Sequence, residues 1–130
     1  MAALPHPRIT PEQYLEIERA SETRNEYYGG EMYAMSGGSY VHGQMIGNVT
    51  GELRARLRGR HCSVTPVDVR VRTSPEGLYS YPDVAVVCGS PVFADDQKDT
   101  LLNPVLLIEV LSPSSASQDR GVKFAQYRRI

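Results

Sequence analysis

The chain has 130 residues, of which 41% are hydrophobic and 22% are charged. This composition is typical of a single globular domain rather than a disordered or fibrous chain. Lysine and arginine number 14 against 15 aspartates and glutamates, for a formal net charge of -1. That balance excludes a global basic field that would draw the protein onto nucleic acid or an anionic membrane, so any such binding must use a local patch.

The first predicted element is a short helix over residues 11–20, followed by a hairpin. Thr10 can act as the N-cap, a proline occupies the first helical position, and Gln13 can complete a capping box. Gly29 and Gly30 then separate two runs rich in tyrosine and methionine. This pattern predicts two antiparallel strands joined by a tight turn.

A long amphipathic helix is predicted over residues 40–57. Its apolar residues recur at helical spacing, and they are Val41, Met45, Ile46, Val49, Leu53 and Leu57. We expect this helix to pack on a sheet. Gly43, Gly47 and Gly51 fall at every fourth position, which favours a smooth stripe that allows close backbone approach over a membrane role, since an apolar helix is lacking.

Three strands are predicted in the second half of the chain. Residues 62–73 alternate well enough for one strand, and "PDVAVVC" is a second, buried strand. The third is "PVLLIEVLS", in which aliphatic residues surround Glu109. That pattern is typical of a strand buried on both faces. A polar loop over residues 89–103 joins the second and third strands.

A last helix is predicted from about residue 118, with Ser117 as one candidate N-cap. The chain stops within this helix, without a C-cap glycine or a following strand. We therefore expect either a fragment or a naturally short product. The order of helix, hairpin, helix, three strands and helix predicts an α/β domain.

The two cysteines, Cys62 and Cys88, have no second cysteine or histidine at metal-ligand spacing. We predict two free, mostly buried thiols, which fits a reducing cytoplasm. The N-terminus lacks the basic start and apolar run of a signal peptide, and no apolar stretch approaches the ~20 residues needed to span a bilayer. A soluble cytoplasmic protein is the expectation.

Glu109 requires a partner, because a lone ionised carboxylate in an apolar strand costs several kcal/mol. Asp83 interrupts the preceding strand in the same way. If the two strands are neighbours and the faces coincide, the carboxylates form an oxygen-rich site suited to Mg²⁺ or Mn²⁺. The alternative is that Glu109 joins a buried ion pair with a lysine or arginine, while Asp83 caps a turn after Pro82.

Several motifs together resemble a known family. They are "RNEYYGGEMYAMSG", "HGQMIGNVTGEL", "YPDVAVVCG", "LLNPVLLIEVLSPSS" and "DRGVKFAQYRRI". Over nearly all of residues 8–130 the chain is similar to the Uma2 family, formerly a domain of unknown function, within the PD-(D/E)XK nuclease superfamily. The resemblance implies a restriction-endonuclease-like fold, with a mixed central sheet flanked by helices. It also implies Asp83 and Glu109 as metal ligands and the carbonyl of Val110 as a third.

The chain departs from the superfamily motif, in which a lysine lies two residues after the glutamate. Leu111 occupies that place. Members of the Uma2 family resemble this chain in carrying the basic residue on the next helix, where Lys123 matches. Its amine would orient the attacking water and stabilise charge on the phosphate. Gln126 and Tyr127, one turn later, could help line the site; a solvated helix charge is the alternative for Lys123.

Three further residues match family positions. Glu26 could be an additional ligand or an acceptor behind the ligands, or simply a surface charge of the hairpin. Glu31, across the turn, is a weaker candidate for a role at the site. His42, near the start of the long helix, could contact the carboxylates or substrate, although a lone histidine at a helix start is more often structural.

Arginines gather at the end of the long helix and on the next strand. They are Arg54, Arg56, Arg58, Arg60, Arg70 and Arg72. They could offer a local basic surface for phosphates. The alternative, which we favour from sequence alone, is that they are solvated cations that complement the helix dipole.

The sequence thus predicts a single Uma2-like domain over residues 1–130, in which the C-terminal part of the family domain is absent. The predicted function is a Mg²⁺- or Mn²⁺-dependent endonuclease that hydrolyses phosphodiester bonds of DNA. The rival is a catalytically silent module that keeps the fold for binding or regulation, since fold does not determine function. We also expect a homodimer that covers an exposed sheet edge.

Overall fold

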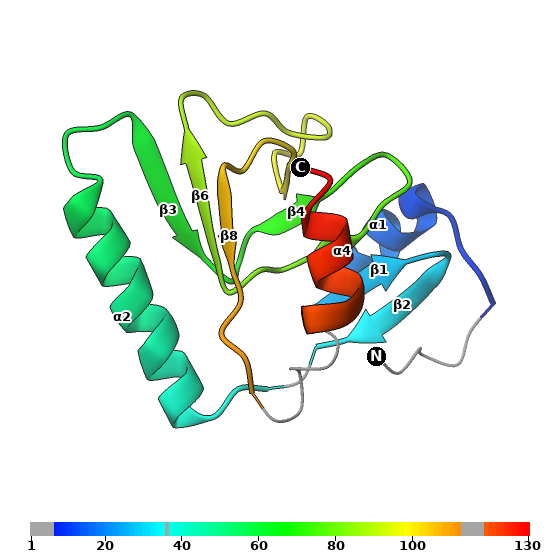
Figure 1. Ribbon diagram of the computed structural model, residues 1–130. Coiled ribbons are helices and arrows are strands. Elements are labelled where there is room, and N and C mark those ends of the chain that lie inside the picture. The colour runs from blue at the N-terminus through cyan, green and yellow to red at the C-terminus, as the bar shows by residue number, and fades with distance from the viewer. Residues whose placement is uncertain (1–6, 36, 113–118) are drawn as a thin grey trace.

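The computed structural model describes residues 7–35, 37–112 and 119–130, and it forms a mixed α/β arrangement (Figure 1). The helical elements are α1 (Pro11–Ala20), α2 (Tyr40–Arg56), the π-helical turn η1 (Asp119–Lys123) and α4 (Phe124–Tyr127). The strands are β1 (Asn25–Tyr28), β2 (Glu31–Ala34), β3 (Cys62–Pro66), β4 (Arg70–Arg72), β5 (Tyr79–Ser80), β6 (Val84–Cys88), β7 (Thr100–Leu101) and β8 (Leu106–Ile108). Ser117, the candidate N-cap, lies outside the described residues.

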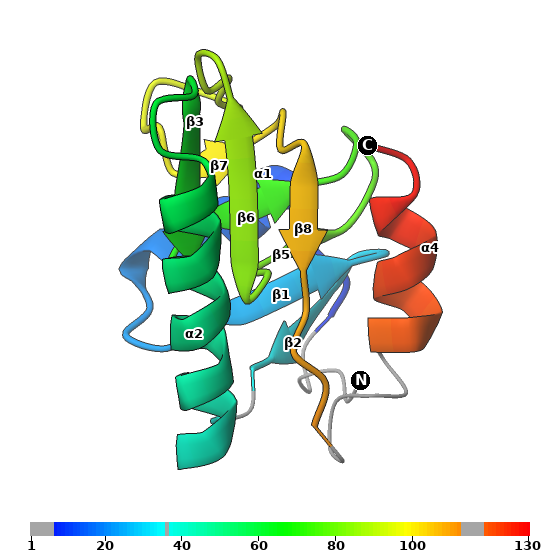
Figure 2. The ribbon, with the colours of Figure 1, turned by 60° about the vertical axis from the view of Figure 1, so that its left-hand side comes forward.

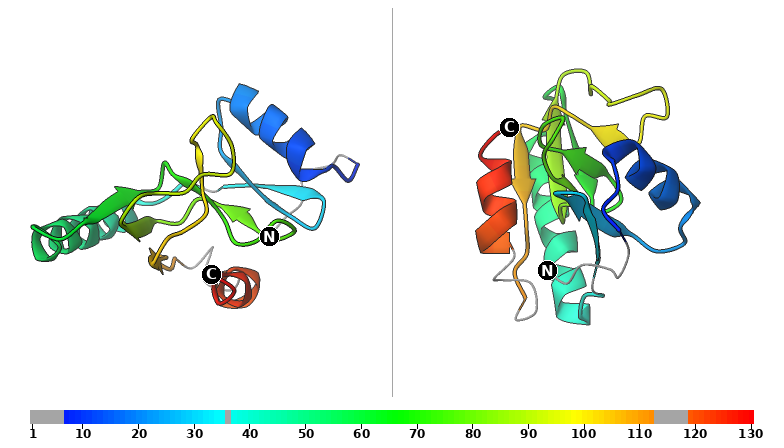
Figure 3. Two further views of the ribbon diagram at one scale, coloured as in Figure 1. Left: turned by 90° about the horizontal axis from the view of Figure 1, so that it is seen from above. Right: turned by 90° about the vertical axis from the view of Figure 1, so that its right-hand side faces the viewer.

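The strands form two sheets, with orders β2-β1-β5-β4-β7 and β3-β6-β8. β4 and β7 run parallel, whereas the other paired strands are antiparallel. Seen from above and from the side, α1 and α4 lie on opposite sides of the strands (Figure 3). The predicted α/β class with mixed strand directions and flanking helices is confirmed, although the strands divide between two sheets. Among the described residues, no helix has the length and apolarity that crossing a bilayer requires.

The N-terminal helix and hairpin form as the local sequence predicts. The Thr10 hydroxyl accepts a hydrogen bond from the Gln13 N–H at 3.1 Å, and the Gln13 side chain accepts one from the Thr10 N–H at 2.9 Å. This reciprocal pair is the predicted capping box. Gly29 and Gly30 have φ angles of 61° and 87°, which favour glycine, and they join β1 to β2.

Helix α2 packs on the smaller sheet through one narrow face. Ile46, Val49 and Leu53 lie against a core of buried valines from β3 and β6. The predicted role of the glycine stripe as a site of close backbone approach is wrong. A Cβ added at Gly43, Gly47 or Gly51 would meet nothing within 4 Å. The physical reason is that the isoleucine, valine and leucine side chains make the sheet contact, while the glycines are exposed.

The single strand predicted over residues 62–73 is wrong, because the structure divides it. β3 ends at Pro66 and β4 begins at Arg70, with a turn between them. Proline has no N–H to donate to a ladder, which favours a strand end there. The two halves also join different sheets. β7 likewise interrupts the loop predicted over residues 89–103.

The prediction that β8 is buried on both faces is also wrong. Val105 is 62% exposed, Leu106 44% and Leu111 40%. β8 is the edge strand of its sheet, with β6 as its one neighbour in the described part of the chain. The aliphatic run therefore predicted the strand correctly but not the exposure of its side chains.

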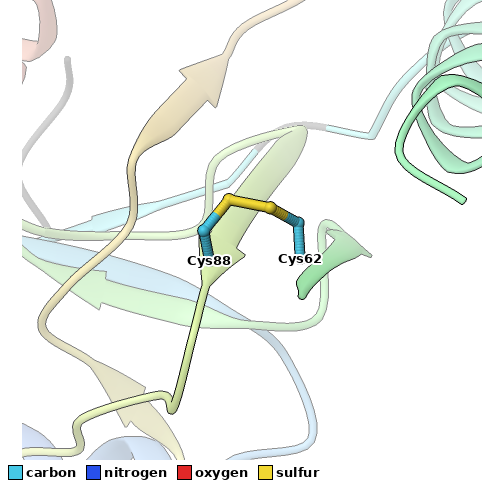
Figure 4. Close-up of a disulfide and its surroundings, with 2 residues drawn as sticks. All are labelled: Cys62 and Cys88. Carbon is cyan, nitrogen blue, oxygen red and sulfur yellow. A yellow bond between two sulfur atoms is a disulfide. The ribbon is translucent and has the colours of Figure 1, made fainter. Parts of the chain in front are cut away.

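The prediction of two free thiols is wrong, because Cys62 and Cys88 form a disulfide (Figure 4). Cys62 and Cys88 face each other directly in the β3–β6 ladder, and their Cα atoms lie 3.9 Å apart. This register brings together two residues whose spacing in the chain carries no pairing signal. The disulfide also removes the thiol argument for a reducing compartment, so the cytoplasmic location stays a prediction.

Thiol titration tests this bond. We expect the denatured, unreduced protein to show no reactive thiol, because both sulfurs are in the disulfide. After reduction it should show two per chain. Two reactive thiols before reduction, in protein purified without reductant, would contradict the disulfide.

Asp99 ties α1 to the segment before β7. Arg19 Nε lies 2.8 Å from its Oδ2, and Arg70 Nη2 lies 2.9 Å from the same atom. The hydrogen bond from Arg19 is the largest cause that lowers the pKa of Asp99 well below its ordinary value. The carboxylate therefore stabilises the fold above its unfolded pKa of ~3.9, and this contribution is lost as the pH falls through the lower folded pKa.

An Asp99→Asn variant should consequently melt at a lower temperature than wild type at pH 7. The gap should shrink as the pH falls below ~4, where the Asp99 carboxyl of the unfolded wild-type chain begins to be protonated while that of the folded protein is still ionised. Melting curves for both proteins across this range provide the measurement. An equal melting temperature at pH 7, or a gap that persists undiminished at low pH, would contradict the role of the ionised carboxylate.

Candidate active site

Asp83 and Glu109 occupy one end of the smaller sheet. Asp83 immediately precedes β6, and Glu109 immediately follows β8. The antiparallel register pairs Val84 with Ile108. Continued by one residue, it sets Asp83 opposite Glu109, and directly opposed residues share a face of the sheet. The two strands are neighbours, as the sequence analysis required.

Asp83 is 7% exposed and is held by the backbone of the neighbouring strand. Its Oδ2 accepts a hydrogen bond of 2.6 Å from the Val110 N–H. The Nε2 of His42 lies 3.6 Å from the same oxygen and 2.8 Å from the Val110 carbonyl. Ser39, the N-cap of α2, accepts a hydrogen bond from the His42 N–H. The first turn of α2 thus places the imidazole beside two of the three ligands that the resemblance implies, Asp83 and the Val110 carbonyl.

Glu109 belongs to a charged cluster with Lys123 and Glu26. Lys123 is 6% exposed, and its Nζ lies 3.0 Å from Glu26 Oε2 and 3.5 Å from Glu109 Oε1. Glu26, on β1, also accepts a hydrogen bond from the Tyr81 N–H at 2.9 Å. The structure therefore brings the predicted lysine to the predicted glutamate, and it forms the ion pair that the alternative reading of Glu109 required.

Of the two predicted residues on α4, Tyr127 extends the cluster, whereas Gln126 bonds to Thr73 instead. The Tyr127 hydroxyl donates to Glu109 Oε1 at 2.7 Å and lies 2.9 Å from Ser80 Oγ. Burial, followed by the negative charge of Glu109, raises the pKa of Tyr127 well above its ordinary value, so the hydroxyl remains a donor. Gln126 is buried and accepts a hydrogen bond from Thr73 at 3.3 Å.

Some of the polar residues around the cluster were not anticipated. The sequence pattern assigned no role to Ser80 and Tyr81, yet they contact Tyr127 and Glu26. The one sequence signal that placed them near the site was their position directly before Asp83 in "YSYPD". Glu31, in contrast, accepts a hydrogen bond from Tyr33 within its own strand.

A cavity of about 760 Å³ also borders Asp83. Its lining includes apolar side chains as well as the polar and charged residues Glu18, Arg24, His42, Arg70, Tyr81 and Asp83. The Arg70 side chain donates hydrogen bonds of 2.9 Å to Tyr81 and Thr100 and is 4% exposed. Arg70 is therefore a buried residue that lines the cavity. It does not belong to the basic surface that the arginines of residues 54–72 could form.

Comparisons with known proteins find a matching family model and two similar proteins. The family model Uma2, described as "Putative restriction endonuclease", matches residues 11–130. Two proteins of Synechocystis sp. (strain ATCC 27184 / PCC 6803 / Kazusa), named "Uncharacterized protein slr1290" and "Uncharacterized protein sll1609", are 35% and 32% identical. The matches cover 95% and 94% of this chain but 64% and 69% of those proteins.

A solved structure shares the fold. It is described as a "putative nuclease belonging to DUF820" from Anabaena variabilis ATCC 29413, and it matches with a TM-score of 0.73 at 18% identity. The match covers 92% of this chain and 67% of that one. Because the family model covers residues 11–130 of the 130-residue chain, the chain belongs to the Uma2 family.

Proposed function

We propose that this protein is a metal-dependent endonuclease that hydrolyses phosphodiester bonds of DNA. The observation that carries the proposal is the position of Lys123, a buried ammonium 3.5 Å from Glu109. It provides from a helix the cation that the superfamily motif places on the strand, where this chain has Leu111. The family description supports the same reaction class.

The donor chemistry at the site fits Mg²⁺ or Mn²⁺. Asp83, Glu109 and Glu26 supply carboxylate oxygens, which these hard cations prefer, against a single ammonium from Lys123. Among the described residues, no three acidic, histidine or cysteine side chains are grouped closely enough to hold a metal by themselves. Mg²⁺ does not require such a group, because it is usually held through one or two carboxylates and keeps several waters.

Asp83 and Glu109 would hold the metal, with the Val110 carbonyl as a further oxygen. When bound, the metal would polarise the phosphate and lower the pKa of a water. Lys123 would orient the attacking water and offset the charge that develops on the phosphate oxygens. Tyr127 fixes the Glu109 carboxylate by donating to it, and His42 fixes the Val110 peptide that holds Asp83.

The test is a panel of double-stranded DNA, single-stranded DNA and RNA, each incubated with purified protein and Mg²⁺ or Mn²⁺. We expect internal cleavage of DNA. Cleavage of RNA alone would change the substrate class. Binding to the panel without cleavage would favour the alternative, a silent nuclease-fold module; that alternative is supported by the ion pairs that Lys123 makes with both Glu26 and Glu109.

A homodimer is part of the proposal. β8 is the edge strand of its sheet among the described residues; Leu106 on it is 44% exposed, and Val105 directly before it is 62% exposed. An exposed edge with apolar side chains is a template for another chain, and a two-fold pairing is the commonest solution. Light scattering should report twice the chain mass. A monomer at high protein concentration would contradict the homodimer.

A further inference from the structure

The far end of α2 carries a concentration of positive charge. Residues 52–63 contain four arginines and one glutamate, for a formal charge of +3 in a chain of net charge -1. Arg54, Arg58 and Arg60, which we call the arginine patch, are all exposed. Arg56 instead pairs with Glu52 at 3.3 Å. The charge balance of the whole chain therefore conceals a strongly basic region.

The arginine patch borders two adjoining depressions of about 330 and 440 Å³. Both are lined by Arg60, Cys62 and Ser63, and neither has an aspartate or glutamate among its lining residues. Within the ranges that the structure describes, Arg54, Arg58 and Arg60 make no ion pair. The three arginines thus border depressions that have no anionic lining residue, and Arg54 also donates a hydrogen bond of 3.2 Å to the Val64 carbonyl.

The backbone beneath the patch is held in place. The Cys62–Cys88 disulfide joins the start of β3 to the end of β6, and Gly89 N–H donates to the His61 carbonyl at 2.6 Å. The Arg60 N–H donates to the Leu57 carbonyl at 3.0 Å, which closes the turn after α2. A fixed backbone reduces the ordering cost of binding, so the surface is preorganised.

The helix dipole does not account for all of these cations. It favours positive charge within the last helical turn, and α2 ends at Arg56. Arg58 and Arg60 lie beyond that end, where the dipole offers little and the neighbouring like charges repel one another. A bound polyanion would relieve this repulsion and would gain from counterion release.

The arginine patch and the candidate active site lie at opposite ends of the same helix and sheet. α2 and β6 run side by side (Figure 2). His42 lies in the first turn of α2 and Asp83 directly precedes β6, whereas the patch lies at and beyond the C-terminal end of α2. At ~1.5 Å per residue, the helix from His42 to Arg54 spans ~18 Å. With one base pair per ~3.4 Å of duplex, this distance corresponds to ~5 base pairs.

We propose that the arginine patch binds the phosphate backbone of double-stranded DNA about half a helical turn from the bond to be cut. The inference rests on the proposed nuclease function for its purpose, but the binding itself can be tested alone. Arginine suits this task because its planar guanidinium donates two hydrogen bonds to one phosphate. Such contacts position the duplex without reading its sequence.

The experiment measures fluorescence anisotropy of a labelled 20-base-pair duplex in EDTA, where no cleavage occurs. The test variant is Arg54→Gln/Arg58→Gln/Arg60→Gln. The matched control is Arg8→Gln/Lys98→Gln/Arg129→Gln, which removes the same charge from exposed residues elsewhere. Circular dichroism and melting curves establish that each variant is folded.

We expect the patch variant to bind at least ~10-fold more weakly than wild type and to lose ~2–3 units from the slope of log K against log salt. The control variant should retain most of the wild-type affinity and most of the wild-type salt dependence. Equal losses in patch and control variants, no binding by wild type, or tighter binding to single-stranded RNA would overturn the proposal. Normal cleavage with no effect of the patch variant on binding would refute the patch alone, whereas patch-dependent binding without cleavage would refute the nuclease function alone.

Discussion

A Lys123→Ala variant is expected to lower turnover ~10²-fold or more while leaving Mn²⁺ affinity nearly unchanged. The lysine Nζ is 3.5 Å from Glu109 and the side chain is 6% exposed, so its charge acts where water screens it poorly. Leu111, at the motif position, can neither orient water nor offset phosphate charge. Single-turnover cleavage rates and calorimetric Mn²⁺ titration measure the two quantities separately.

Arg120→Ala is the matched control, because Arg120 is the other basic residue of η1. Removing one partner of a buried ion pair also destabilises a protein, often by ~3–5 kcal/mol, so rates must be compared at a temperature where melting curves show each variant to be folded. If Lys123→Ala cuts at the wild-type rate while Arg120→Ala is inactive, the role passes to Arg120. If neither variant matters, the nuclease proposal loses its main support.

Glu109→Gln and Asp83→Asn should each abolish detectable Mn²⁺ binding in calorimetry. Each change keeps the side-chain shape but removes the negative charge that makes a carboxylate a good ligand for a hard cation. Wild-type protein should also melt at a higher temperature in millimolar Mg²⁺ or Mn²⁺, since a ligand that binds the folded state stabilises it by ~2.7 kcal/mol at 100 times its dissociation constant.

Glu31→Gln serves as the control for these variants, because Glu31 pairs with Tyr33 within β2 and carries no proposed ligand role. It should bind Mn²⁺ as wild type does. Equal Mn²⁺ affinity in wild type, Glu109→Gln and Asp83→Asn would refute the metal site. A melting temperature that does not respond to metal would favour a purely structural ion pair between Lys123 and Glu109.

Local chemistry made the first part of the fold predictable. The Thr10 capping box and the Gly29-Gly30 turn depend on residues a few positions apart, so the sequence alone contains the information. The Cys62–Cys88 disulfide and the exposure of β8 depend instead on which strands become neighbours. No single-sequence periodicity encodes that choice, and both predictions failed for this reason.

The candidate site was predictable to a similar extent. Asp83 and Glu109 stand out because each places a charge in an aliphatic strand, and Lys123 was assigned through the family resemblance. The contact of His42 with the Val110 carbonyl joins residues 68 positions apart. Such a contact follows from the way α2 lies along the sheet, which the spacing of apolar residues in α2 could not reveal.

Cleavage of a supercoiled plasmid, with metal removed and restored, tests the central claim most directly. Protein stripped with EDTA should leave the plasmid intact, addition of Mg²⁺ or Mn²⁺ should produce nicked and linear DNA, and Asp83→Ala prepared in parallel should produce neither. Cleavage that survives in EDTA, or that Asp83→Ala retains at the wild-type rate, would contradict a metal-dependent nuclease centre at Asp83 and Glu109.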